Sequence, residues 1–225
     1  VAVKWFENKL SQAIEVVEDH YSKFRINDAL MTIYKLFWDD YCSWYLEIVK
    51  PGFGAAVDKV TYDATLGFFE ALVKMIHPIM PFITEELWQN IEERPAGATI
   101  MFAPTPKAGK YDDAFIREFD TAREAVVALR SIRKQKNIPM KNALELKVKG
   151  EFPMEMASAV KKLAGVSSVE KVQDADNQGV PFIIGTIEFF VPLSGLVNVE
   201  EELSKLEADL EYQKKFLEGV RRKLS

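Results

Sequence analysis

The sequence predicts a mainly α-helical protein, in which an antiparallel helical bundle is followed by a small α+β module and a terminal coiled-coil helix. Three patterns support this fold class. Apolar residues recur every three or four positions through most of residues 1–135, they alternate with polar residues in 143–150, and they follow a 4-3 spacing after residue 198. Because 48% of the residues are hydrophobic and 12% are aromatic, the chain can bury a sizeable core.

Four amphipathic helices with short connections make up the predicted bundle. The first spans residue 3 to about residue 24, and the second begins after an Asn27 N-cap and stops at Pro51. The third covers 57–77, and the fourth runs from Pro81 towards the break at 95–97. The core stripe of the second helix is predicted to be Leu30, Tyr34, Phe37, Tyr41, Trp44 and Ile48.

A loop and a fifth helix complete the first predicted domain, residues 1–140. Residues 95–111 contain several prolines and glycines and little periodicity, which is typical of a surface loop. Asp112 and Asp113 then cap a helix that ends before Pro139.

Residues 141–196 are predicted to form the small α+β module. The alternating segment that opens it is typical of a half-buried strand. A short helix over 154–163 and two strands over 166–172 and 182–191 follow, and Gly185 interrupts the last strand.

Residues 197–225 are predicted to begin a coiled coil. Asn198 and Glu201 have the spacing of a capping box, and apolar residues then occupy heptad positions. These residues are Val199, Leu203, Leu206, Leu210, Leu217, Val220 and Leu224. Since the sequence contains no partner helix for them, we expect one arm of a longer coiled coil, which would form a non-physiological dimer when isolated.

The composition argues against several classes of function. One cysteine and two histidines provide neither a disulfide framework nor a zinc site, and no apolar run is long enough to span a membrane. The sequence has no glycine-rich phosphate loop and no nucleophile with a neighbouring base. We therefore expect no catalytic residue, no metal and no cofactor in this chain. Because no signal peptide is recognisable, we expect a cytoplasmic protein.

A basic segment stands out against a net charge of −5. Residues 123–149 hold eight basic and two acidic residues, a local charge of +6 that leaves −11 for the rest of the chain. Four of these basic residues form a cluster that either contacts phosphates or is a solvated helix end. The cluster consists of Arg130, Arg133, Lys134 and Lys136.

The second helix carries more aromatic residues than one stripe can hold. Trp38 and Tyr45 fall on the flank of the predicted stripe, and Trp38 is near Arg25 and Lys35 in the sequence. An exposed ring beside cations suits the stacking of an unpaired nucleobase. Packing of Trp38 in the core is the alternative.

Several segments resemble the C-terminal part of class I aminoacyl-tRNA synthetases. The sequences FRINDAL at 24–30 and HPIMPFITEELW at 77–88 are similar to the class in general. The sequence WDDYCSWYLE at 38–47, the RSIR and NIP sequences within 130–139, and VPLSGLVNVE at 191–200 resemble the valyl-tRNA synthetase family in particular. The resemblance covers essentially the whole chain.

This resemblance implies an anticodon-binding bundle and the first arm of a tRNA-binding coiled coil. The class carries a His-Ile-Gly-His-type motif and a Lys-Met-Ser-Lys-Ser-type loop in its catalytic domain, and neither occurs here. The editing domain is missing as well. The chain is therefore expected to bind tRNA specific for valine without catalysis, as part of an ATP-dependent valine–tRNA ligase. Neither DNA nor a membrane is an expected partner.

Chemical reasoning within this resemblance suggests eight RNA-binding residues. For the anticodon loop they are Arg25, Lys35, Trp38 and Tyr41, and for the RNA backbone they are Arg130, Arg133, Lys134 and Lys136. Two alternatives stay open. In the first, the chain is the equivalent domain of an isoleucyl or leucyl enzyme. In the second, it is a protein-interaction module that uses its coiled-coil helix.

Overall fold

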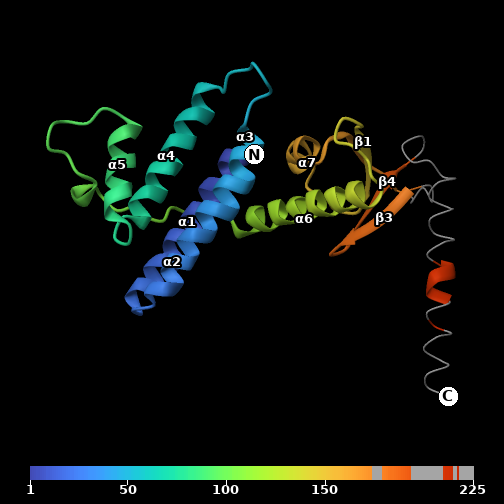
Figure 1. Cartoon of the computed structure of the whole chain (residues 1–225), viewed down its shortest axis with the longest axis horizontal. Coiled ribbons are helices and arrows are strands. Elements are labelled where there is room, and N and C mark those ends of the chain that lie inside the picture. The colour runs from blue at the N-terminus through green and yellow to red at the C-terminus, as the bar shows by residue number, and fades with distance from the viewer. Residues whose placement is uncertain (174–178, 194–209, 215–216, 218–225) are drawn as a thin grey trace. The chain divides into compact units, whose positions relative to one another are not determined.

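The computed structural model of this chain describes residues 1–173, 179–193, 210–214 and 217. It confirms the predicted fold class, because the described chain is mainly helical and contains a small mixed sheet (Figure 1). The chain divides into two compact units, Val1–Glu124 with Pro153–Leu163 and Ala125–Phe152 with Ala164–Ser225. The predicted domain boundaries at residues 140 and 196 stay a prediction.

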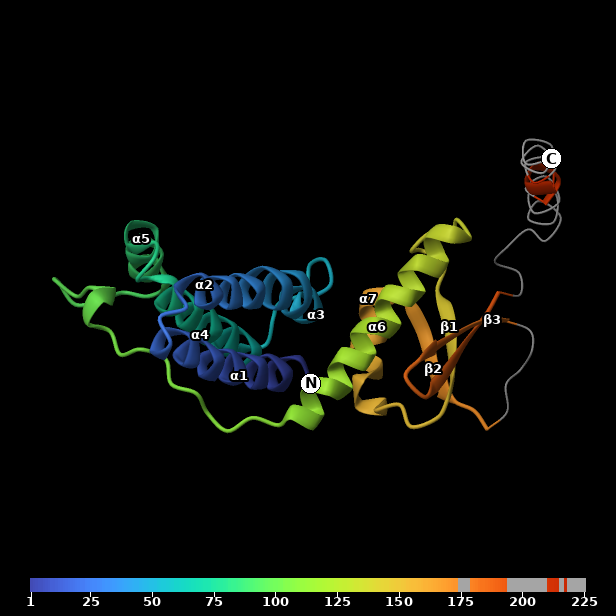
Figure 2. The same cartoon turned by 90° about the horizontal axis from the view of Figure 1, so that it is seen from below.

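Helices make up the first unit. They are α1 (Ala2–Ser22), α2 (Ile26–Lys35), the π-helix η1 (Leu36–Tyr45), α3 (Leu46–Val49), α4 (Lys59–Ile76), α5 (Pro81–Ile91), the short 3-10 helix η2 (Ile100–Phe102), the first turns of α6 (Asp113–Gln135), the 3-10 helix η3 (Met154–Met156) and most of α7 (Ala157–Ala164). Helices α1, α2 and α4 pack against one another, and α5 packs on α4 (Figure 2). Short connections between long helices produce the bundle that the periodicity predicts.

Aromatic rings from distant segments fill the centre of this unit. Trp5 stacks on Phe119 of α6 with ring centroids 4.0 Å apart, and Phe6 contacts Tyr41 and Tyr45 at 5.2 and 5.1 Å. All five side chains are buried. Because each such ring removes about 150–250 Å² from water, this cluster supplies much of the hydrophobic stabilisation of the bundle.

The π-helix changes which face of the second helix is buried. Ile33 and Leu36 are buried, and the next buried residues are Tyr41 and Tyr45. The five-residue step from Leu36 to Tyr41 matches the i→i+5 period of a π-helix, whereas the predicted stripe assumed steps of three and four throughout. The predicted stripe was wrong at two places. Before the π-helix, Tyr34 is exposed and its neighbour Ile33 is buried, and after the five-residue step Tyr45, expected on the flank, is fully buried. Tyr41, which the stripe included, is buried as predicted.

The predicted start of the second helix was also wrong. Arg25 occupies the N-cap position of α2, and Asn27 lies inside the first turn. The tight turn that ends α1 brings the chain into helical conformation before Asn27 is reached. The cap predicted for the fifth helix is confirmed, since Asp112 Oδ1 accepts a hydrogen bond from the Ala114 amide at 2.9 Å.

Glu85 of α5 fixes the loop over 95–111. Its carboxylate accepts hydrogen bonds from Thr99 Oγ1 at 2.6 Å and from the Ile100 amide at 3.1 Å. The side chain of Ile100 is buried against Val73 and Trp88. The loop is therefore anchored to the bundle at its 3-10 turn.

The second unit contains the rest of α6 and a four-stranded sheet. Its strands are β1 (Leu144–Lys149), β2 (Val166–Lys171), β3 (Gly179–Ile184) and β4 (Ile187–Pro192), in the order β2-β1-β4-β3. Strand β1 pairs parallel with β2 and antiparallel with β4. Between β1 and β2 the chain forms η3 (Met154–Met156) and α7 (Ala157–Ala164), where a short helix was predicted.

The last predicted strand, 182–191, is a β-hairpin instead. Strands β3 and β4 pair antiparallel on either side of Gly185 and Thr186. Gly185 has a φ of +57°, which a two-residue hairpin turn requires and which glycine adopts without strain. Pro181 lies on β3, the edge strand, where its missing N–H is tolerated.

Most of the predicted coiled-coil helix, including the capping box at Asn198 and Glu201, lies outside the described residues. Residues 210–214 and 217 are helical. The side chains of Leu210 and Leu217 are 55% and 53% exposed.

Candidate nucleic-acid interface

Lys35 and Trp38 form an exposed pair where α2 meets η1. Trp38 is 56% exposed, so it is not a core residue, and Lys35 and Tyr34 are exposed as well. Lys35 is the last residue of α2, and Trp38 lies three residues further on in the first turn of η1. Arg25 is exposed at the other end of α2, and ten residues of helix separate it from Lys35 by about 15 Å. Lys35 and Trp38 are therefore both exposed at the junction of α2 and η1, whereas Arg25 is exposed at the other end of α2.

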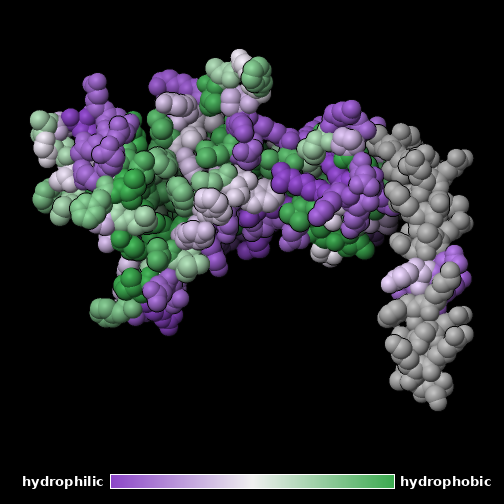
Figure 3. All heavy atoms as spheres, in the orientation of Figure 1, coloured by the Kyte–Doolittle hydropathy of each residue, from purple (hydrophilic) through white to green (hydrophobic). Residues whose placement is uncertain are grey.

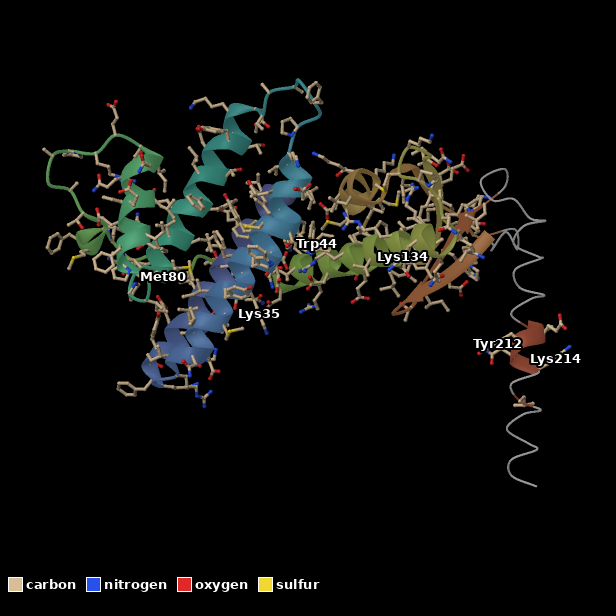
Figure 4. All side chains as sticks on the ribbon, viewed as in Figure 1. Lys35, Trp44, Met80, Lys134, Tyr212 and Lys214 are labelled. Carbon is tan, nitrogen blue, oxygen red and sulfur yellow. The ribbon has the colours of Figure 1, made fainter. Side chains whose placement is uncertain are left out.

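An apolar groove lies among α2, η1, α4 and α5. It has a volume of about 200 Å³ and is lined by Ile33, Phe37, Phe69, Leu72, Val73, Ile76, Met80, Ile83, Thr84 and Leu87. Met80, Ile83 and Leu87 are exposed, and Figure 3 shows hydrophobic residues gathered over α4 and α5. In Figure 4, Lys35 lies on α2 and Met80 on the connection between α4 and α5. The sequence analysis did not predict this groove.

Tyr41 does not have the position expected of a base-stacking residue. Its side chain is 4% exposed and lies in the aromatic core, and its hydroxyl donates a hydrogen bond to the Thr65 carbonyl at 3.0 Å. Burial raises the pKa of Tyr41, with the neighbouring Tyr45 as a smaller cause. We therefore correct the assignment of Tyr41 from RNA contact to core packing.

Arg133 is likewise internal. The side chain is 4% exposed, and its guanidinium donates hydrogen bonds of 2.7–2.9 Å to four backbone carbonyls. These carbonyls belong to Pro139, Asn142, Ala164 and Gly165. With those donors occupied, Arg133 holds the end of α6 to the segments before β1 and β2, and we remove it from the predicted phosphate contacts.

Gly165 allows this arrangement. It has a φ of +66°, and a Cβ at this position would lie 3.0 Å from Nη2 of Arg133. A larger residue would therefore be strained and would crowd the guanidinium.

The rest of the basic cluster remains at the surface of α6 and the loop after it. Arg130 and Lys134 are exposed and four residues apart, so they share a helix face. Figure 4 shows Lys134 on α6. Lys136 is half-buried. Arg130 and Lys134 border an open hollow of about 420 Å³, whose other lining residues are Arg133, Asn137, Ile138, Pro139 and Met140.

Two further residues of the basic segment are engaged within the protein. Arg123 forms an ion pair with Asp40 at 2.9 Å and lies 4.8 Å from the centroid of the Trp44 ring. Lys149 pairs with Glu188 across the sheet at 3.5 Å. The basic segment is therefore less available to a partner than its charge of +6 suggests.

The described residues offer neither a metal site nor a membrane span. No three histidine, cysteine, aspartate or glutamate residues in that part of the chain come together as metal ligands. None of its helices is long and apolar enough to cross a bilayer. Cys42 is half-buried, and burial raises the pKa of its thiol, so it lacks the thiolate character of a nucleophile.

Comparisons with known proteins agree with the nucleic-acid interpretation. A family described as the anticodon-binding domain of tRNA ligase matches residues 3–148. Valine–tRNA ligase of Parabacteroides distasonis is 49% identical over 224 residues, and those of Phocaeicola vulgatus and Bacteroides fragilis are 46% identical over 226. Each alignment covers 100% of this chain and 26% of the relative, so the chain spans about a quarter of the length of the curated relatives it matches. The chain belongs to the anticodon-binding domain family of tRNA ligases and is similar over its whole length to valine–tRNA ligases.

Proposed function

We propose that this chain is the part of a valine–tRNA ligase that binds the anticodon arm of tRNA specific for valine. The observation that carries the proposal is the alignment of the entire chain with valine–tRNA ligases. The whole enzyme would be a cytoplasmic, ATP-dependent ligase. This chain would contribute binding and positioning of the tRNA, whereas activation of valine would take place in the catalytic domain.

The pair of Lys35 and Trp38 is the proposed base-reading element. Its exposed indole ring offers a stacking face, and the adjacent ammonium group neutralises phosphate. The apolar groove, whose lining includes Phe37, can accept the face of a base that leaves the anticodon stack. Arg130, Lys134 and Lys136 are the proposed contacts to the RNA backbone, because cationic side chains bind a phosphate whatever base its nucleotide carries.

A binding assay with anticodon stem-loops tests this function. The labelled valine stem-loop is titrated with the purified chain and followed by fluorescence anisotropy, and the isoleucine and leucine stem-loops serve as competitors. We expect tighter binding of the valine loop and no pyrophosphate exchange above background. Equal affinity for the three loops would refute anticodon reading, and preference for another loop would move the chain to that enzyme.

Replacement of Trp38 by Ala tests the base-reading element itself. Because stacking on one aromatic ring contributes about 1–3 kcal/mol, we expect affinity to fall about tenfold with little change in thermal unfolding. Tyr62 of α4 is 54% exposed, so Tyr62→Ala is a matched control that should bind normally. A large loss of stability in Trp38→Ala, with normal binding by the folded fraction, would assign Trp38 to packing.

A further inference from the structure

A short turn joins α1 to α2 (Figure 1). It places Phe24 in an unfavourable backbone conformation. The Arg25 amide donates to the His20 carbonyl at 2.8 Å, and the Phe24 amide donates to the Tyr21 carbonyl at 3.1 Å. These two bonds define a Schellman motif, which needs a left-handed residue at the position that Phe24 occupies. Phe24 has a φ of +57°, and glycine is the usual residue there because it has no Cβ.

Packing gives no reason for phenylalanine at this position. The side chain of Phe24 is 88% exposed, so its ring gains almost nothing from burial. Among the described residues, Asn137 is the other non-glycine residue with positive φ, and asparagine tolerates that conformation. A bulky residue that is both strained and exposed stabilises neither the turn nor the core. Its ring is available to a binding partner.

We propose that Phe24 is a stacking platform for a nucleobase of the bound tRNA. This inference rests on the proposed function, which supplies an RNA partner. An aromatic face open to solvent is what base stacking requires, and the next residue, Arg25, is also exposed and can contact the adjoining phosphate. Because α2 separates this turn from Trp38, the two rings contact different nucleotides. The Schellman bonds hold the turn rigid, so the ring is presented with little loss of backbone entropy on binding.

The substitution Phe24→Gly separates a binding role from a structural one, because its two effects have opposite directions. Glycine fits the left-handed position, so thermal unfolding should stay the same or move to higher temperature. Loss of the ring should weaken binding of the valine anticodon stem-loop about fivefold or more. Phe24→Trp keeps a stacking face and should restore binding to near the wild-type value.

Phe82 provides the matched control. It is 90% exposed on α5 and adopts ordinary helical backbone geometry, so Phe82→Ala should bind as the wild type does, whereas Phe24→Ala should not. If Phe24→Gly and Phe24→Ala bind normally while Trp38→Ala is impaired, the inference is wrong and the proposed function stands. If Phe24→Gly lowers the melting temperature together with binding, the ring is structural and the inference is also overturned. If the wild-type chain binds no stem-loop, both fail.

Discussion

Removal of the Arg133 guanidinium should destabilise the second unit strongly. In the structure, four carbonyls accept hydrogen bonds of 2.7–2.9 Å from the Arg133 guanidinium. Arg133→Met keeps much of the aliphatic stem but removes every one of these donors. A buried acceptor that loses its partner costs about 1 kcal/mol at the low end of the measured range. The carbonyls of Pro139 and Gly165 keep a backbone hydrogen bond, from the amides of Asn142 and Leu144. The two carbonyls that lose their partner, those of Asn142 and Ala164, predict a loss of about 2 kcal/mol in the free energy of unfolding.

Urea unfolding followed by circular dichroism measures this loss, and the neighbouring residue gives the control. Lys134 is exposed, so Lys134→Met should change the free energy of unfolding by no more than about 0.5 kcal/mol. Arg133→Lys should fall between the two, because an ammonium group has three donors and cannot donate to all four carbonyls at once. If the free energy of unfolding of Arg133→Met is within about 1 kcal/mol of the wild-type value, the four hydrogen bonds do not hold this unit together.

Three further predictions concern RNA contacts, pH and association. Double replacement of Arg130 and Lys134 by Ala should reduce the slope of log affinity against log salt by roughly one per lost phosphate contact, and an unchanged slope would make both residues a solvated helix end. Burial alone would raise the pKa of Glu70, but hydrogen bonds from Lys74 and Trp88 outweigh it, so its pKa is lowered. The stability that Glu70 contributes should be present above its unfolded pKa of about 4.3 and be lost as pH falls through the folded pKa. In Glu70→Gln the free energy of unfolding should therefore fall less steeply with decreasing pH below about pH 5. Sedimentation should show concentration-dependent dimers of the full chain and monomers of a chain that ends at residue 197, whereas equal monomeric masses would contradict the exposed-seam prediction.

The sequence predicts features that depend on local periodicity and composition. The helices of the bundle, the alternating strand β1 and the cap at Asp112 follow from side-chain spacing, since one face of each element must be apolar to be buried. The sequence left both exposure and core packing open for Trp38, and the structure decides for exposure. The family is recognisable from short segments such as 77–88, because their residues are contiguous in the chain.

The tertiary structure decides what depends on helix phase and on contacts between distant residues. A π-helix leaves no distinct pattern in the sequence, yet it shifts the buried face by one residue and moves Tyr45 into the core. Arg133 and Lys134 are adjacent basic residues on one helix, and the direction in which each side chain points decides that one is buried on four carbonyls while the other is exposed. The charge of a residue is a property of the sequence, but whether that charge meets solvent or backbone depends on how the chain folds around it.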